Sequence, residues 1–332
     1  MPDHQLSFER PIYELEFRLE QLEKSAENTP DVRNSIMNLR RELLELKRKI
    51  YQNLSAWETV EVARHPNRPQ TCDYLSFAFD DFVELHGDHF FGDDRAIRTG
   101  WAKIDSTRVM VVGHQKGKNI QERNDCYFGC AHPEGYRKAI LKMKLAEKFH
   151  LPVVCLIDTP GAWPGVGAEE RGQAYIIAQA MYEMSTLHTP IICVVIGEGG
   201  SGGALGIGVG DRIAILEHAY YSVISPEGCA GILWKSGEHK QKAASALRLT
   251  SKDLKGFGVV DTVIPEPLGG AHRDPRLMAG NLKSFLRTTL RELMKIPPEE
   301  LLEARYEKFR RYGVFLDPES APEIVVEAAE KF

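Results

Sequence analysis

The sequence predicts an α/β protein whose largely parallel sheet is covered by helices on both faces. Two short, continuous apolar runs, at residues 151–157 (LPVVCLI) and 190–196 (PIICVVI), are typical of strands that are buried on both sides. Segments with helical spacing alternate with these runs, which is the pattern of strand–helix–strand units. With 332 residues, 43% of them hydrophobic, the chain can form a buried core in one large domain or two.

The N-terminal segment, residues 8–54, has the pattern of two helices. In its second half, apolar residues recur at alternating intervals of three and four, as in a helix that packs along a partner helix: Ile36, Leu39, Leu43, Leu46 and Ile50. The polar stretch SAENTP, which ends at Pro30, separates this helix from an earlier one with its own apolar residues: Ile12, Leu15, Leu19 and Leu22. We expect a helical hairpin that packs on the main domain or on another subunit.

The remaining elements alternate between strands and helices. Besides the two buried runs, the predicted strands lie at residues 98–104, 108–115, 212–218, 220–225 and 258–267. The predicted helices are one containing Leu75, Phe79, Phe82 and Val83, one at 134–150, one at 169–188, two segments between the strands at 220–225 and 258–267, and two over 274–311 divided by Pro297 and Pro298.

Charge and hydropathy exclude several classes of protein. The net charge of −5 provides no basic field for nucleic acid. The longest apolar runs are the length of strands, so no membrane span is expected. The N-terminus has no apolar signal region and is acidic, unlike a transit peptide, so we expect a cytoplasmic protein.

The six cysteines do not predict a metal site. Cys155 and Cys193 lie within the two buried runs and are expected to be small core residues. Cys126 and Cys130 form a close pair that fits half of a zinc site loosely, but no second pair accompanies it. We therefore expect ordinary reduced thiols and no metal in this chain.

The most unusual segment, residues 196–211 (IGEGGSGGALGIGVGD), has eight glycines between Gly197 and Gly210. It follows the second buried strand, and another glycine-rich loop, DTPGAWPGVGA, follows the first. Ligands of α/β sheets bind beyond the carboxyl ends of the strands, and the start of a helix presents unpaired N–H groups. Because glycine lets a reacting carbonyl approach those groups, the two loops predict an oxyanion hole.

Three other interpretations of the glycines compete with an oxyanion hole. A dinucleotide-binding loop requires G-x-G-x-x-G after the first strand, and these glycines come well after it. A P-loop requires G-x-x-x-x-G-K-[ST], which does not occur. Tight packing of a helix on the sheet explains part of the run, and we assign Gly206, Gly208 and Gly210 to packing rather than to chemistry.

Several long motifs occur in order and resemble a known family. Residues 132–173, 196–211 and 221–236 (YSVISPEGCAGILWKS), together with YELEFRLEQLE, ARHPNRPQTCDYL and IPEPLGGAHRDP, are similar to the α subunits of the carboxyltransferase of bacterial-type acetyl-CoA carboxylase. The resemblance implies a crotonase-like superhelix of ββα units with an N-terminal helical hairpin and C-terminal helices. We expect an N-terminal segment at 1–65, a carboxyltransferase core at 66–270 and a C-terminal helical segment at 271–332. Residues 119–130 match the family pattern less well.

The resemblance also implies a reaction and a set of partners. The carboxyl group of carboxybiotin, which a separate biotin carboxyl carrier protein holds, would move to acetyl-CoA and form malonyl-CoA for fatty acid biosynthesis. A β subunit with a zinc ribbon would complete an α2β2 complex and bind the thioester of acetyl-CoA. A separate biotin carboxylase would perform the ATP-dependent step. No nucleic acid, membrane or permanently bound cofactor is expected.

The site residues implied by the resemblance belong to the two glycine-rich loops. The catalytic main-chain donors map onto Gly161 and Ala162 in the first loop and onto Gly202 and Gly203 in the second. Carboxybiotin would contact Gly202 and Gly203, with Gly199 and Gly200 ranked below them. Because the biotin anion can take the proton from acetyl-CoA itself, no side chain is required as the base.

Other polar side chains near the loops are expected to be structural. Glu198, Glu169, Glu170 and Arg171 either orient the loops by hydrogen bonding or sit at helix starts, and we favour the second role. Ser225, Pro226 and Glu227 match a helix N-cap and first turn. We expect His114 and His132 to be non-catalytic, and we expect Arg137 and Lys138 to lie on a solvated helix face rather than to contact a CoA phosphate.

The sequence does not exclude other functions. The chain could act on another acyl-CoA, such as propionyl-CoA, as a carboxyltransferase or decarboxylase. It could be a non-catalytic assembly subunit whose helical arms organise a complex. A nucleotide-binding enzyme is a third class, which would require this chain alone to bind ATP.

Overall fold

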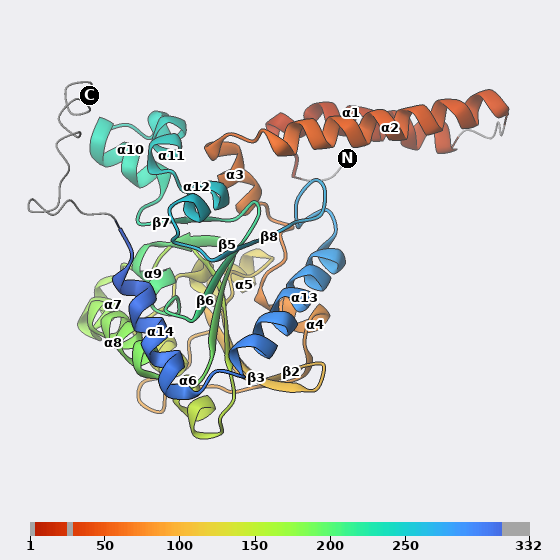
Figure 1. Cartoon of the computed structure of the whole chain (residues 1–332). Helices are drawn as coiled ribbons and strands as arrows, with labels where there is room; N and C mark the ends of the chain where they lie inside the picture. The colour runs from red at the N-terminus through yellow and green to blue at the C-terminus, as the bar shows by residue number, and fades with distance from the viewer. Residues whose placement is uncertain (1–3, 25–28, 314–332) are drawn as a thin grey trace, which may run out of the picture.

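The computed structural model describes residues 4–24 and 29–313 of the chain (Figure 1). Within these residues, eight strands form one sheet in the order β1-β2-β3-β4-β5-β6-β8, and β7 pairs with β5. The strands are β1 (Asp80–Glu84), β2 (Ile97–Ile104), β3 (Thr107–His114), β4 (Val153–Thr159), β5 (Ile191–Gly200), β6 (Arg212–Leu216), β7 (Tyr220–Ser222) and β8 (Thr262–Ile264).

The predicted α/β class is confirmed. β1, β2 and β3 form an antiparallel meander, whereas β3, β4, β5, β6 and β8 pair in parallel. Each connection between parallel neighbours from β3 to β6 contains a helix, as a crossover requires. The connection from β3 to β4 contains α6 (Pro133–Lys148). The connection from β4 to β5 contains α7 (Val166–Glu170) and α8 (Gln173–Thr186), and that from β5 to β6 contains α9 (Ser201–Leu205).

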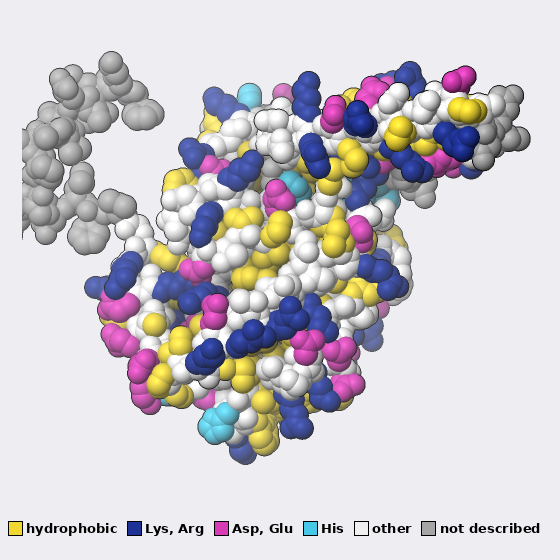
Figure 2. All heavy atoms as spheres, turned by 45° about the vertical axis from the view of Figure 1, so that its right-hand side comes forward, with side chains coloured by type: hydrophobic (Ala, Val, Ile, Leu, Met, Phe, Trp, Pro, Cys, Tyr) yellow, Lys and Arg dark blue, Asp and Glu magenta, His cyan; other side chains and the backbone are white. Residues whose placement is uncertain are grey.

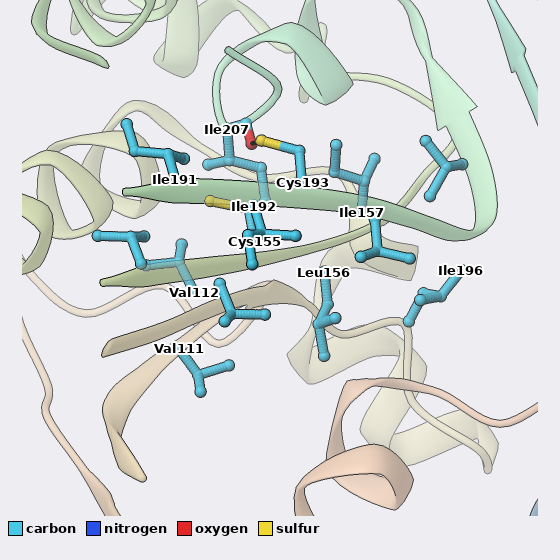
Figure 3. Close-up of a cluster of buried hydrophobic side chains, with 14 of the residues drawn as sticks. Val111, Val112, Cys155, Leu156, Ile157, Ile191, Ile192, Cys193, Ile196 and Ile207 are labelled. Atoms are coloured by element: carbon cyan, nitrogen blue, oxygen red, sulfur yellow. Dashed lines mark hydrogen bonds between the residues drawn. The ribbon is translucent and has the colours of Figure 1, made fainter. Parts of the chain in front are cut away.

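The two central strands lie in the middle of the core, as their sequences predict. Every residue of β4 and β5 is buried, and the side chains from β3, β4 and β5 pack together in Figure 3. Cys155 and Cys193 are register partners in this core, and the Cys193 thiol lies 3.5 Å from the Ile207 carbonyl. Both cysteines are therefore core residues, as expected.

Helices cover the sheet from both sides (Figure 1). On one side, α6 packs against α8 and α8 against the C-terminal helix α14 (Pro298–Arg310). On the other side, α13 (Pro275–Leu293) packs against α4 (Thr71–Phe77), and its apolar face joins the main core through Leu282, Leu286, Leu290 and Leu293. The remaining helices are η1 (Ser7–Glu9), α1 (Arg10–Lys24), α2 (Pro30–Gln52), α3 (Ala56–Ala63), α5 (Ile120–Asp125), η2 (Tyr127–Gly129), α10 (Pro226–Trp234), η3 (Gly237–His239), α11 (Lys240–Leu247) and α12 (Ser251–Gly256).

The predicted N-terminal hairpin is present as α1 and α2, which pack along each other and extend away from the sheet (Figure 1). Part of the predicted break, residues 25–28, lies outside the described residues. At the base of the hairpin, the buried Glu9 carboxylate accepts hydrogen bonds from Tyr51 (2.7 Å) and Arg273 (3.0 Å). Acidic, basic and apolar side chains are mixed along its visible surface (Figure 2).

One predicted helix is too long. The helix expected to contain Leu75, Phe79, Phe82 and Val83 ends at Phe77, and residues 80–84 form β1 instead. Val83 pairs with Trp101 in β2, and the Phe82 ring packs over Gly100, where a Cβ would lie 2.6 Å from it. Tertiary pairing therefore overrides an apolar spacing that also fits a helix.

The helix predicted at 169–188 is divided into α7 and α8. Gly172 has φ of 79°, a left-handed conformation that glycine adopts without steric cost, and it stands immediately before α8. After β7 the structure has three α-helices, α10 to α12, where two helical segments were predicted. β5 also extends four residues beyond the predicted strand, to Gly200, because β7 pairs with residues 198–200.

Candidate functional site

The two glycine-rich loops meet at the carboxyl ends of β4 and β5. A Cβ on Gly203, in α9, would overlap the main-chain carbonyl carbon of Gly161 and lie 2.5 Å from the nitrogen of Ala162. A Cβ on Gly200 would overlap the carbonyl of Pro160. The absence of side chains at these positions therefore allows the start of α9 to pack directly on the loop that follows β4.

Main-chain N–H groups come together where the loops meet. The Gly161 N–H donates to the Thr159 hydroxyl oxygen at 3.1 Å, whereas within the described residues the Ala162 N–H donates to no other group. The N–H groups of Gly202 and Gly203 lie in the first turn of α9, where a helix has no internal acceptor for them. Ala162, Gly202 and Gly203 therefore offer the donors, while Thr159 already engages Gly161.

Gly202 borders open space rather than packed atoms. A Cβ there would meet only Ile177 side-chain carbons, at 3.8 Å. Gly202 and the exposed Ser201 line a cavity of about 550 Å³, with walls that include Leu205, Tyr221 and Val223. A ligand of moderate size and largely apolar character can reach the start of α9 through this cavity.

Gly199 and Gly200 lie within β5 and are buried. Gly199 pairs with Thr159 on one side and with Tyr221 on the other, and a Cβ there would lie 2.8 Å from the Tyr221 ring. The two glycines allow neighbouring strands and the Pro160 carbonyl to come close. The cavity beside α9 is lined by Gly202 and not by either of them.

Protein atoms already occupy the space beside the glycines that were assigned to packing. Cβ atoms on Gly206, Gly208 and Gly210 would lie 2.5 Å from the Tyr136 ring, 2.7 Å from the Ala204 carbonyl oxygen and 2.8 Å from the Cys193 sulfur, respectively. Only a small part of the segment at 196–211 is helical, because α9 ends at Leu205.

A charged cluster lies under the two loops. Glu198, one residue before Gly199, accepts hydrogen bonds from Arg64 (2.6 Å), Lys116 (2.5 Å) and Tyr220 (2.6 Å). Burial alone raises the pKa of Glu198, but the positive charges of Lys116 and Arg64 outweigh burial and lower this pKa to about 2. Glu198 thus stays ionised, and it lies in a strand rather than at a helix start.

The other residues that flank the loops are placed at helix ends. Glu169 lies in the first turn of α7, and Arg171 forms a two-point ion pair with Glu134 of α6, with distances of 2.9 and 3.2 Å. Ser225 caps α10 by accepting the Gly228 N–H at 3.0 Å, as its motif predicts. Glu227 has an additional contact, an ion pair with Arg64 at 2.6 Å.

The two histidines considered in the sequence occupy different surroundings. His114 is fully buried, and burial lowers its pKa to about 3, so it is neutral near pH 7. His132 stacks on Trp163, in the loop after β4, with ring centroids 5.2 Å apart. Neither is paired with a carboxylate in hydrogen-bonding geometry, which agrees with their expected non-catalytic roles.

The expectation of a solvated helix face at Arg137 and Lys138 is wrong. Lys138 is 1% exposed and forms an ion pair with Asp93 at 2.5 Å, and Arg137 donates to the buried Asp88 at 2.8 Å. Both cations hold the loop between β1 and β2 against α6. The helical pattern did not reveal this role, because the carboxylates come from a distant segment.

The described residues show no other chemical centre of the kinds considered. The six cysteines are free, and no group of three or more His, Cys, Asp or Glu side chains in this part of the chain is arranged to hold a metal ion. No helix among the same residues is long and apolar enough to span a bilayer.

Solved structures share the fold. Transcarboxylase 12S aligns with a TM-score of 0.53 at 22% identity, over 67% of this chain and 42% of that chain. This chain thus spans less than half of the transcarboxylase chain. A Pseudomonas malonate decarboxylase hetero-tetramer aligns with a TM-score of 0.54 at 16% identity, over 65% and 86% of the two chains. The crotonase-like fold expected from the resemblance is therefore confirmed.

Closer relatives cover nearly the whole chain. The acetyl-coenzyme A carboxylase carboxyl transferase subunit alpha of Rhodopirellula baltica is 61% identical over 94% of this chain and 98% of its own length. The protein of the same name from Methylococcus capsulatus is 52% identical over 94% and 98%. A family model described as acetyl co-enzyme A carboxylase carboxyltransferase-like matches residues 5–313. The chain belongs to this acetyl-CoA carboxylase carboxyltransferase family.

Proposed function

We propose that this chain is the α subunit of an acetyl-CoA carboxylase carboxyltransferase. The reaction would transfer the carboxyl group of carboxybiotin to acetyl-CoA and form malonyl-CoA for fatty acid biosynthesis. The observation that carries this proposal is the packing of α9 on the loop after β4, which brings Gly203 against Ala162, while the neighbouring Gly202 lines a cavity. The relatives that share 50% or more of the sequence over almost its full length support the same reaction.

The chain's part in the reaction would be to stabilise negative charge. When bound, carboxybiotin supplies the carboxyl group, and its ureido oxygen gains negative charge as that group leaves. The N–H groups of Gly202 and Gly203, with that of Ala162 and secondarily Gly161, would donate hydrogen bonds to this oxygen. Donors already held in place are worth about 3–4 kcal/mol each in such sites. Gly199 and Gly200 would let the strands beneath approach closely enough to hold these donors.

The cavity fits the proposed substrate. Its volume of about 550 Å³ and its apolar walls suit the ring and chain of a biotin group, and Gly202 lies on its wall. Within the described residues, the two loops supply no histidine or thiol at the N–H groups to act as a base. In the proposed mechanism, the biotin anion itself takes the proton from acetyl-CoA.

The remaining parts of the reaction belong to other proteins. We propose that a zinc-ribbon β subunit binds acetyl-CoA and forms an α2β2 complex with this chain in the cytoplasm. A biotin carboxyl carrier protein would deliver the carboxyl group from a biotin carboxylase. In this chain, residues 66–270 would form the catalytic core, between the segments at 1–65 and 271–332.

Replacement of Gly202 by Ala tests the proposal, because the fold has room for the added methyl group. In the complex with the β subunit, the added methyl group would occupy the open space beside the N–H groups and displace the substrate oxygen. We therefore expect G202A to slow carboxyl exchange between malonyl-CoA and a biotin derivative about 10²-fold. Its melting temperature should not fall, because alanine favours a helix over glycine.

Gly280→Ala is the matched control. Gly280 also lies in a helix, and nothing would be within 4 Å of its Cβ, but it is in α13, away from the loops. G280A should stabilise the protein by up to about 1 kcal/mol and leave the exchange rate unchanged. A G202A complex that exchanges carboxyl groups at the wild-type rate would contradict the proposal and favour a non-catalytic assembly subunit.

A further inference from the structure

The hydrogen-bond ladder between β4 and β5 is interrupted just before the two loops. Regular parallel pairing runs from Val153 and Ile191 to Ile157 and Val195, and the next pair is Thr159 with Gly199. Between these pairs, β4 has one residue, Asp158, while β5 has three, residues 196–198. After the interruption, main-chain pairing between the two strands is therefore limited to the single pair of Thr159 with Gly199.

Side chains bridge this interruption. The Asp158 carboxylate accepts the main-chain N–H of Glu198 at 2.9 Å. The Lys116 ammonium, two residues beyond β3, lies 2.6 Å from Asp158 Oδ1 and 2.5 Å from Glu198 Oε2. A Cβ on Gly197 would overlap Asp158 Oδ1, so this glycine makes the room that the carboxylate occupies. Residues near the carboxyl ends of β4 and β5 are thus joined through one cation.

The bridge is held in place from its other side. The second oxygen of Glu198, Oε1, accepts hydrogen bonds from Arg64 Nε and from the Tyr220 hydroxyl, both at 2.6 Å. Arg64 also donates to the Tyr220 oxygen at 2.9 Å. The side chains of Asp158 and Glu198 are 5% and 8% exposed, and that of Lys116 is 17% exposed, so water screens these contacts little.

We infer that Lys116, Asp158 and Glu198 are positioning residues for carboxyl transfer, which set the spacing between the two loops and their main-chain donors. The inference rests on the proposed function. Thr159 to Ala162 directly follow Asp158, and Gly199 to Gly203 directly follow Glu198. Any change in the distance between these carboxylates moves one set of N–H groups relative to the other. A misplacement of about 1 Å can cost about 10² in rate.

Lys116→Met tests the inference against a control at the opposite end of β5. Arg305 is 1% exposed and donates to Asp211 at 2.8 and 2.9 Å, and to the carbonyls of residues 184, 187 and 189. Both replacements remove a cation from a buried cluster: Lys116→Met leaves the carboxylates of Asp158 and Glu198 behind, and Arg305→Met leaves that of Asp211. Lys116→Met should lower the kcat of carboxyl exchange in the α–β complex about 10²-fold, with KM changed by less than about threefold. Arg305→Met should lower the melting temperature but keep kcat per folded molecule within about twofold.

Hydrogen exchange of residues 196–205 gives a readout that does not depend on activity. Lys116→Met should lose protection in this segment, and Arg305→Met should not. Equal losses of kcat in the two variants, in proportion to their losses of stability, would overturn the inference.

Asp158→Asn keeps the test decisive if Lys116→Met does not fold. It preserves the shape of the side chain and an acceptor for the Glu198 N–H, and it removes only the charge that Lys116 contacts. We expect kcat to fall about tenfold, and an Asp158→Asn complex with wild-type kcat would overturn the inference. A wild-type complex with no exchange activity would instead contradict the proposed function, so the two failures are distinguishable.

Discussion

The two ends of β5 have similar groups, but these groups lie in different surroundings. Each end has a buried ion-pair cluster and glycines in close contact with neighbouring atoms. At the amino end, Asp211 and Arg305 satisfy main-chain groups around them, and the space beside Gly210 is filled by Cys193 and Ile191. At the carboxyl end, Glu198 and Lys116 form an ion pair, and the start of α9, three residues after Glu198, borders a cavity at Gly202.

The glycines lie in two kinds of surroundings: protein atoms crowd the side-chain position at Gly210 and Gly203, and open space borders Gly202. Gly210 is required because protein atoms already occupy the place of its side chain. Gly202 has no such neighbour, so packing alone does not explain why this position lacks a side chain. A buried ion pair, in the same way, serves stability at one end and the placement of loops at the other.

The largest contrast in activity is expected between Gly203→Ala and Gly210→Ala. At Gly203, the new methyl group would force the main chain at Gly161 and Ala162 to move, so carboxyl exchange should fall about 10³-fold. At Gly210, it would press on Cys193 and the Ile191 carbonyl and cost about 1–3 kcal/mol of stability. Exchange assays on the complex and urea unfolding of the chain measure the two effects. Similar activity per folded molecule in both variants would remove the distinction between the two ends.

The carboxyl end should also make stability sensitive to acid. The pKa of Glu198 is about 2 in the fold, and an unperturbed glutamate titrates near 4.5. Between these values the unfolded chain binds the proton more readily, so the stabilisation is complete above pH 4.5 and is lost as the pH falls toward 2. This carboxylate therefore contributes about 3 kcal/mol that acid removes.

Glu198→Gln isolates this contribution. Urea unfolding between pH 3 and 7 should show a shallower loss of stability in Glu198→Gln than in the wild type. Glu266, whose pKa the nearby Arg68 lowers to about 2 against the effect of burial, remains in both proteins and supplies a common background. Parallel curves for wild type and Glu198→Gln would show that Glu198 is not held ionised by its neighbours.

The smallest effects are expected from two residues in left-handed conformations. His150, before β4, has φ of 53°, and Ser201, after β5, has φ of 49°. Replacement of either by glycine should relieve strain and raise stability by about 1 kcal/mol, measured as a higher melting temperature. His150→Gly should keep full exchange activity, whereas Ser201→Gly should lose a few-fold because glycine loosens the start of α9. Full activity in Ser201→Gly would show that α9 needs no rigid first residue.

Much of the site was predictable because its signals are local in the chain. Glycines at Gly202 and Gly203, and at Gly161 beside Ala162, follow two apolar strands, and parallel strands bring such loops to one edge of a sheet. The positioning residues carried no such signal. Lys116, Asp158 and Glu198 come from three separate strand ends, and nothing in their spacing along the chain predicts that they meet.

The α/β class and the N-terminal hairpin could be predicted from the sequence alone, because apolar periodicity and turn residues act over a few neighbours. The order of the strands in the sheet, with β7 paired to β5, came only from the structure. Only the tertiary structure decided that residues 80–84 form a strand, that Gly172 divides a helix and that Lys138 is buried. Those outcomes depend on partners far away in the chain. The free energy of pairing with them exceeds the small local preferences that a sequence window contains.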